Sequence, residues 1–258
     1  MDLAFLPVLV LGAFIHGVLG FGFPMFSTPA LILLYPLPVV VLLTLLPTLS
    51  INIASIAGEK HWREAFVRYW PIPVFTIIGS IAGTQIMFGL DPKPLRLILA
   101  VVMMIYLVAD KLPAAAIERN VPRWLMALFG ASLGLMGGLT NTMAPAIVVY
   151  ALYTRMNPLL VVAAFNFTFL ISKSGQVAGF LANRQLDWNI VGLSAWALPA
   201  ILLSLWIGMR LRRRMDTAAY LAALRYTLWL IAIVLIADGI IAFDWLPANQ
   251  AETPNLQG

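Results

Sequence analysis

The chain has 258 residues, of which 62% are apolar and 10% are charged, and its formal net charge is +5. No Asp, Glu, Lys or Arg occurs between Leu3 and Gly58. Uncharged apolar runs of about 18 residues or more are typical of bilayer-spanning helices, so the sequence predicts an integral membrane protein. Cysteine is absent, which excludes disulfides, thiolate metal sites and thiol chemistry. The basic loops serve membrane topology and do not indicate nucleic acid binding.

The first uncharged segment, residues 3–35, is interrupted by helix breakers. It is too long for one membrane span and too short for two spans with a turn, since each span needs about 20 residues. The stretch "GVLGFGFP" places three glycines and a proline in eight residues. We therefore expect two half-helices that turn back at Gly20–Pro24 near the middle of the membrane. Pro29 is expected in the first turn of the returning half-helix, with Ser27 or Thr28 as its N-cap.

A second uncharged segment, residues 124–154, has the same character. Its expected break is Gly137–Thr142, and Pro145 is expected in the first turn of the returning half-helix. The candidate caps of that half-helix are three neighbouring polar residues, Thr140, Asn141 and Thr142. The remaining apolar segments are each long enough to cross the membrane as one helix, and they are Leu37–Ala57, Tyr69–Gly89, Leu95–Ala109, Pro158–Leu181, Trp188–Met209 and Ala219–Phe243.

Three sequence matches indicate that the chain is a duplication. "STPALILLY" matches "MAPAIVVYA", and "LVAD" matches "LIAD", in the same order along the chain. The spacing from Trp62 to Pro73 recurs between Trp188 and Pro199. Such internal symmetry is typical of secondary transporters. The predicted division is a first transmembrane repeat, a cytoplasmic linker, a second transmembrane repeat and a disordered tail, at residues 1–112, 113–121, 122–246 and 247–258.

The positions of Lys and Arg decide how the two halves are oriented, because cytoplasmic loops carry an excess of these residues. If each broken segment were a single span, the basic residues would divide evenly between the two sides. If each segment turns back, eleven Lys and Arg residues are cytoplasmic and three are external. We therefore predict an all-α polytopic membrane protein of two inverted repeats. Each repeat is a V-shaped broken-helix pair plus three transmembrane helices.

The two turns are candidates for an anion-binding site. Helix N-termini present unpaired N–H groups and the positive end of the helix dipole, and half-helices that enter from opposite sides would aim both at one spot. Gly22 and Gly138, taken as matching places in the two turns, would let the backbone approach the anion; the alternative is that the glycines serve only helix packing. The candidate site residues at the turns are Gly20, Gly22, Ser27, Thr28, Gly138, Thr140, Asn141 and Thr142.

Lys173 is the only charged residue in the expected span Pro158–Leu181. An ammonium within a membrane span is costly and indicates function, although extension of the side chain to the membrane surface is an alternative. Asn166 and Gln176 on the same span, and Asn52 on the matching span of the first half, are further candidates for binding the anion. Polar side chains of this kind can also serve only to join helices.

His16 lies just before the first turn and could bind the anion when it is protonated, or relay a proton. A neutral imidazole hydrogen-bonded to the backbone is the alternative. No enzyme constellation is found, because the sequence has no buried carboxylate pair, no HExxH and no GxSxG in a suitable context. We expect no enzymatic activity, no cofactor and no metal.

Three stretches carry a resemblance to a known family: "GVLGFGFPMFSTPALILL", "NIASIAGEKHWREAFVRYW" and "GASLGLMGGLTNTMAPAIVVYAL". They resemble the sulfite exporter TauE/SafE family, and the resemblance covers essentially residues 5–245. It implies a membrane carrier for sulfur-containing anions such as sulfite or sulfonates.

The prediction is therefore a secondary transporter that moves a small sulfur-containing anion across the inner membrane of a bacterium by alternating access. An anion channel, a carrier of a non-sulfur carboxylate and a non-transporting membrane scaffold are the alternatives. The expected partners are the anion and the lipid bilayer. Protons as the coupling ion and a homodimer are carried as further hypotheses.

Overall fold

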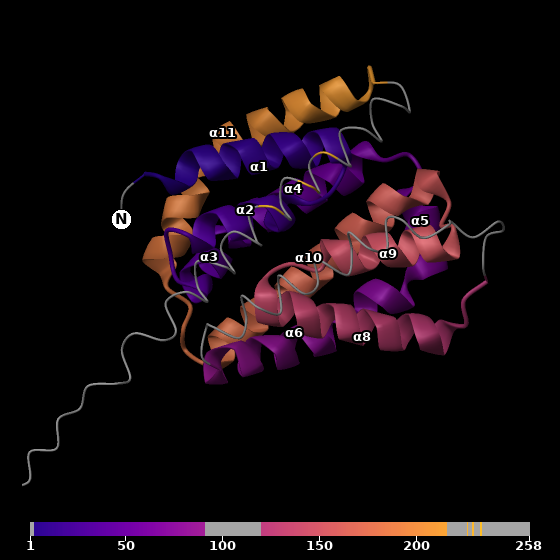
Figure 1. Cartoon of the computed structure of the whole chain (residues 1–258), viewed down its shortest axis with the longest axis horizontal. Helices are drawn as coiled ribbons and strands as arrows, with labels where there is room; N and C mark the ends of the chain where they lie inside the picture. Colours follow the sequence, from indigo (N-terminus) through magenta and orange to yellow (C-terminus); the bar gives the residue numbers. More distant parts are fainter. Residues whose placement is uncertain (1–2, 91–119, 216–225, 227–228, 230–232, 234–258) are drawn as a thin grey trace, which may run out of the picture.

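The structure is a computed structural model that describes residues 3–90 and 120–215, together with Tyr226, Trp229 and Ile233. All regular elements in these residues are α-helices (Figure 1). They are α1 (Phe5–Leu19), α2 (Phe23–Ile32), α3 (Leu37–Leu43), α4 (Leu45–Gly58), α5 (Trp62–Tyr69), α6 (Pro71–Gly89), α8 (Arg123–Thr140), α9 (Ala144–Thr154), α10 (Pro158–Ala182) and α11 (Trp188–Arg212).

Some predictions fall on residues that the structure does not describe. The predicted span Leu95–Ala109 and the tail 247–258 lie wholly outside the described residues. The span Ala219–Phe243 and the linker 113–121 lie almost wholly outside them.

The predicted full spans in the described residues form long apolar helices. Three of them, α6, α10 and α11, are long and apolar enough to cross a membrane on their own. The helices α3 and α4 meet this condition together, as one segment bent by 43°. The sequence did not predict the short helix α5, which lies in the charged loop between two spans.

The bend between α3 and α4 has a local cause in Pro47. Proline has no N–H to donate to the carbonyl of Leu43, and its ring collides with that carbonyl in a straight helix. The helix therefore ends at Leu43 and starts again at Leu45. The Thr44 hydroxyl at the bend donates to the carbonyl oxygens of Val40 and Val41 at 2.8 and 3.1 Å. The bend thus places a buried hydroxyl within this segment of the chain.

The first broken region turns back where the sequence predicts. Gly20 and Gly22 have φ values of 85° and 101°, which L-residues with a side chain rarely adopt. The N–H of Gly20 donates to the carbonyl of His16 and closes α1. The N–H of Phe23, the first residue of α2, donates to His16 Nδ1 at 3.3 Å, and Ser27 lies against Gly12, so α2 runs back along α1.

The structure corrects the expected start of this returning half-helix. The N-cap of α2 is Gly22, which has no side chain, and the N–H of Phe23 is accepted by His16 of α1. Ser27, Thr28 and Pro29 all lie inside α2, so neither hydroxyl is the cap and Pro29 is not in the first turn. Pro24 is the second residue of α2, where its missing N–H leaves no hydrogen bond unmade.

The second broken region turns at Asn141. This residue is left-handed, with φ of 60°, and its N–H donates to the carbonyl of Gly137 at 2.8 Å. Asn141 therefore caps the end of α8, and the Thr140 hydroxyl donates back to the Met136 carbonyl at 2.8 Å. The sequence predicted both as candidate caps for the start of α9, but they lie at the end of α8 instead. The rings of Phe129 and Tyr150 stack at 4.4 Å, which places α9 back along α8.

The two turns match in a different register from the one that the sequence suggested. Pro145 is the second residue of α9, as Pro24 is of α2, so Pro24 rather than Pro29 is its counterpart. Likewise the left-handed Gly20 corresponds to Asn141. Gly138 lies inside α8 rather than in the turn, so it is not the counterpart of Gly22.

Close glycine contacts join each ingoing half-helix to a long helix from the other half of the chain. Figure 1 shows α1 beside α11 and α6 beside α8. A Cβ at Gly17 would lie 2.8 Å from the Met209 nitrogen on α11. A Cβ at Gly138 would lie 2.8 Å from the Thr84 nitrogen on α6. These glycines allow backbone to approach backbone, which is the usual role of small residues between membrane helices.

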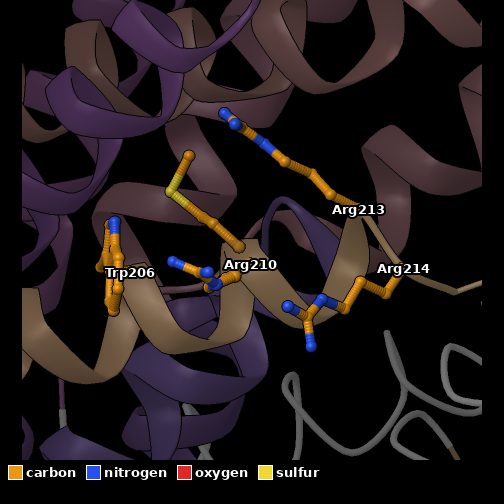
Figure 2. Close-up of a pocket in the computed structure, with 5 residues that line it drawn as sticks. Trp206, Arg210, Arg213 and Arg214 are labelled. Atoms are coloured by element: carbon orange, nitrogen blue, oxygen red, sulfur yellow. The ribbon is translucent and has the colours of Figure 1, made fainter.

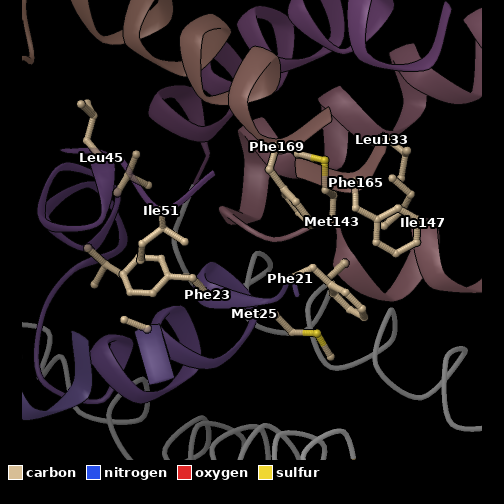
Figure 3. Close-up of a cluster of buried hydrophobic side chains, with 14 of the residues drawn as sticks. Phe21, Phe23, Met25, Leu45, Ile51, Leu133, Met143, Ile147, Phe165 and Phe169 are labelled. Carbon is tan, nitrogen blue, oxygen red and sulfur yellow. The ribbon is translucent and has the colours of Figure 1, made fainter. Parts of the chain in front are cut away.

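Helix α10 lies between α4 and α6 and contacts both turns. Apolar side chains of the turns, such as Phe21 and Met143, pack around it, and Figure 3 shows them together with Phe165 of α10. The rings of Phe21 and Phe165 meet edge to face, with centroids 5.1 Å apart. Near the other end of α10, Phe180 meets Phe88 of α6 at 4.9 Å. The turns are therefore buried in protein, as non-helical backbone in a membrane requires.

We predict that Gly138→Ala lowers the melting temperature of the purified protein. The added methyl group would meet the Ser80 carbonyl and the Thr84 nitrogen, and overpacking of this kind costs about 1–3 kcal/mol. Gly192→Ala is the matched control, because Gly192 lies in α11 with open space around it. The control should keep or raise the melting temperature, since alanine favours a helix by up to about 1 kcal/mol. Equal melting temperatures for both variants would contradict the packing role of Gly138.

Candidate functional site

Helix α10 carries three buried polar side chains that reach the two turns. Asn166 Nδ2 donates to the carbonyl of Gly20 in the first turn at 2.7 Å. Gln176 Nε2 donates to the carbonyl of Gly137 at the second turn at 2.8 Å. Lys173 Nζ donates to Oδ1 of Asn141, also in the second turn, at 2.8 Å. One helix thus holds both broken regions through groups that the sequence singled out.

The most polar point in the described core is the Lys173 cluster, which we define as Thr28, Thr44, Asn141 and Lys173. Lys173 Nζ lies 3.3 Å from the carbonyl of Val41 and 3.5 Å from the Thr44 hydroxyl, in addition to its bond to Asn141. Asn141 Nδ2 donates to the hydroxyls of Thr28 and Thr44 at 2.9 and 3.0 Å. The cluster therefore joins α2, the α3–α4 bend, the second turn and α10.

The charge of Lys173 has no carboxylate partner among the described residues. Ion pairs among the described residues include His61–Glu64 and Arg212–Glu59, and neither involves Lys173. Lys173 is 3% exposed, and its hydrogen bonds all go to neutral oxygen atoms. The side chain is therefore buried in the protein rather than extended to its surface. A buried ammonium whose described partners are all neutral is costly, and an anion bound beside it would lower that cost.

His16 takes part in the structure of the first turn. Its Nδ1 accepts the N–H of Phe23 at 3.3 Å, so that nitrogen carries a lone pair. Its Nε2 lies 3.0 Å from the Ser55 hydroxyl on α4 and can donate to it. These partners fit a neutral imidazole, with the tautomer assigned from the hydrogen bonds. His16 thus satisfies an N-terminal N–H of α2 and leaves one fewer for an anion.

Four of the predicted site residues have buried polar atoms without a hydrogen-bond partner in the described part of the chain. The atoms are Ser27 Oγ, Asn52 Nδ2, Thr142 Oγ1 and Asn166 Oδ1. Leaving such a group unpaired costs about 1–3 kcal/mol. Native proteins leave few buried polar atoms unpaired, so these four are available to a ligand.

The sequence predicted that the two turns meet at one spot. In the structure they lie at different positions along α10. Asn166, which binds the first turn, and Lys173, which binds the second, are seven residues apart on α10. This separation is about 10 Å along a helix. The first turn lies nearer the start of α10 and the second nearer its end, so each turn reaches past the other. The predicted residues therefore fall into two groups, and Gly138, Ser27 and Asn52 belong to neither.

The first group surrounds Gly20 and the second surrounds Asn141. The first contains His16, Gly20, Gly22 and Asn166. The second contains Thr28, Thr140, Asn141, Thr142, Lys173 and Gln176. Ser27 and Asn52 are buried on α2 and α4. No group of three His, Asp or Glu residues in the described chain could hold a metal ion.

Two residues at these groups were missed from the sequence. Thr44 is the only hydroxyl in "LPVVVLLTLLP", three residues before Pro47, and that spacing could have indicated a bend with a polar group. Arg212 lies at the end of α11, where its guanidinium packs against Gly20 and donates to Glu59 Oε1 at 2.6 Å. Nothing in the run "RLRRR" distinguishes this arginine from its neighbours. The ion pair joins the ends of α4 and α11 beside the first turn.

Comparison with known proteins decides the family. A sequence model of the sulfite exporter TauE/SafE family matches residues 5–236. The chain belongs to this family. A search of curated proteins and a search of solved structures give no significant match. TauE/SafE proteins are membrane transporters rather than enzymes, and membership implies transport of sulfite or a related sulfur anion. A buried ammonium with only neutral partners among the described residues suits such a cargo.

We predict that Asn141 has separable backbone and side-chain roles. Asn141→Gly keeps the left-handed conformation but removes the amide that bonds Lys173, Thr28 and Thr44, so the protein should fold with a melting temperature somewhat below wild type. Asn141→Leu forces a branched side chain to φ near 60°, which costs about 1–2 kcal/mol, and should lower the melting temperature further. Melting curves of the two purified variants test this. Equal losses in both would assign the role of Asn141 in stability to its amide alone.

Proposed function

We propose that this TauE/SafE protein is a secondary transporter that carries sulfite or a small sulfonate across the bacterial cytoplasmic membrane by alternating access. The observation that carries the proposal is the buried ammonium of Lys173, which has only neutral partners in the described chain. An oxyanion bound there would neutralise the charge. Release of the anion on the other side would restore the present arrangement.

The Lys173 cluster offers the hydrogen-bond donors that an oxyanion needs. The ammonium has three N–H groups and can form charge-assisted bonds, which are about twice as strong as neutral ones. The hydroxyls of Thr28 and Thr44 can rotate to donate to the anion. Thr142, beside the second turn, has a free buried hydroxyl among the described residues. In this proposal the anion takes the place of the Asn141 oxygen on Lys173.

The first-turn residues are proposed as a second step on the path. The free Nδ2 of Asn52 can donate to an anion, and Asn52 shares α4 with Ser55, the partner of His16. The separation of about 10 Å along α10 makes this a separate position from the Lys173 cluster. An anion would reach it as it moves between the cluster and the end of the molecule that carries Arg212.

An inverted repeat would give the two halves the symmetry that alternating access needs. Two features support it. Each ingoing half-helix packs through a glycine on a long helix of the other half, Gly17 on Gly208 and Gly138 on Gly83. Each also ends in a left-handed residue whose N–H donates four residues back. Because α8 is bound to α6 of the first half, rocking of the halves would move the second turn relative to α10.

The decisive test is transport by Lys173→Met in proteoliposomes. Wild-type protein should show saturable uptake of labelled sulfite that is stimulated by unlabelled sulfite inside. Lys173→Met should reduce this uptake at least tenfold, equivalent to about 1.4 kcal/mol, while folded protein is retained because a buried charge has been removed. Ser174→Ala, at the exposed neighbouring residue on α10, is the matched control and should transport normally.

The possible results separate the alternatives. Uptake that does not saturate and shows no stimulation from inside would indicate a channel. Saturable uptake of carboxylates in place of sulfite would indicate a different cargo. Normal sulfite uptake by Lys173→Met would remove the Lys173 cluster from the mechanism.

Asn141→Asp is a second variant of the same site. It places a carboxylate about where the Asn141 amide oxygen accepts from Lys173, at 2.8 Å. The ammonium would then have an internal counter-ion, so the variant should fold and yet transport sulfite at least tenfold more slowly. Unchanged transport by a folded Asn141→Asp protein would contradict a need for an unpaired ammonium.

The inverted repeat predicts which loops face the cytoplasm. The chain has no cysteine, so Lys60→Cys and Arg184→Cys each introduce a single reactive group. Lys60 lies near the end of α11 and Arg184 near its start, and both side chains are exposed. In intact cells an impermeant thiol reagent should label the cysteine at 184 and not the one at 60. The reverse pattern, or labelling at both positions, would overturn the proposed topology.

A further inference from the structure

A pocket at the C-terminal end of α11 lies outside the two groups described above. It has a volume of about 340 Å³ and is lined by Trp206, Met209, Arg210, Arg213 and Arg214. Figure 2 shows the ring of Trp206 beside Arg210, with Arg213 and Arg214 in the following turn. The Arg210 guanidinium lies 5.3 Å from the centre of the Trp206 ring, and this cation–π contact holds one wall of the pocket.

The three arginines of this pocket carry positive charge that the described residues leave uncompensated. Arg212, within the same run, points to the opposite side of α11 and pairs with Glu59. Arg210, Arg213 and Arg214 are exposed and form no ion pair with a described residue. Three guanidinium groups around one hollow favour an anion that accepts several hydrogen bonds.

The position of the pocket identifies the source of that anion. The preceding residues on the outer side of α11 are apolar and exposed, with Leu203 at 59% and Ile207 at 46%. Basic residues begin at Arg210. Exposed apolar residues followed by Trp and Arg are typical of the boundary between lipid hydrocarbon and headgroups. The pocket therefore faces the phosphate layer of the membrane.

The inner side of α11 serves a different purpose. Gly208 packs against α1, and Leu205 and Arg212 share that side of the helix. Trp206, Arg210, Arg213 and Arg214 follow the helical spacing of the outer side. Most of the pocket lining thus lies on the side of α11 that faces away from Gly208 and α1.

We propose that this pocket binds the phosphate headgroup of an anionic phospholipid. The arginines bind the phosphate oxygens, and Trp206 and Met209 contact the first carbons of the acyl chains. Basic residues near a membrane surface attract anionic lipid by about 1 kcal/mol each, and the pocket adds a defined position to this general attraction. The site does not depend on which anion the protein transports.

The proposal is tested with the purified full-length protein in a neutral detergent. Phosphatidylglycerol should raise the melting temperature of wild type, phosphatidylcholine should not, and native mass spectrometry should detect retained phosphatidylglycerol. The variant Arg210→Gln/Arg213→Gln/Arg214→Gln should bind phosphatidylglycerol at least tenfold more weakly. The corresponding Lys variant should lose less, because it keeps the charges but not the two-pronged hydrogen bonding of guanidinium.

The matched control is Lys60→Gln/Arg63→Gln/Arg68→Gln, which removes three basic charges from the α4–α5 region outside the pocket. It should keep the response to phosphatidylglycerol. Equal loss in this control would reduce the effect to general charge attraction and overturn the proposal. The proposal is also overturned if phosphatidylglycerol raises the melting temperature of the pocket variant as much as that of wild type. A rise of the same size with inorganic phosphate or sulfite, lost in the pocket variant, would overturn it too. Should the triple variant fail to fold, Arg213→Gln alone replaces it, and unweakened binding by that variant overturns the proposal.

Discussion

The ammonium of Lys173 lies inside a helix bundle in which its hydrogen bonds reach only neutral oxygen atoms of the described chain. A charge in this position needs partners, and the arrangement of the surrounding helices supplies them. The α3–α4 bend contributes a carbonyl and a hydroxyl, and the second turn contributes the Asn141 amide. Each of these groups lies at or next to a helix interruption. The broken helices and the buried charge are therefore parts of one arrangement.

The same physical constraint explains the polar side chains of α10. Backbone groups at a helix break that is shielded from water need hydrogen-bond partners from the protein. Asn166 donates to the first turn and Gln176 to the second, while His16 accepts an N–H at the start of α2. These side chains satisfy the turns and also bring them to α10. Structural support and a candidate binding role are combined in the same few residues.

Family membership and the geometry around Lys173 both indicate an anionic cargo. Membership in the TauE/SafE family implies transport of a sulfur anion, and a buried ammonium with only neutral described partners suits a small oxyanion. Arg212 and the arginines beside it illustrate a different use of charge. Arg212 is drawn inward by Glu59 and the first turn, whereas its neighbours face outward at the end of a lipid-exposed helix. The four arginines of residues 210–214 thus lie in two environments. One contacts Glu59 and the first turn, and three are exposed.

The sequence by itself determined the membrane character, the long apolar helices and the approximate position of both breaks. These features depend on local chemistry: uncharged runs must be buried in lipid, and Gly and Pro interrupt a helix wherever they cluster. It also singled out Lys173, because a lone charge in a span is conspicuous. The tertiary structure alone decided which residues meet. Gly138 packs on α6, Thr44 joins Lys173, and the two turns pass each other along α10. Such contacts depend on how helices far apart in the chain pack, and the spacing of residues within one helix carries no record of its neighbours.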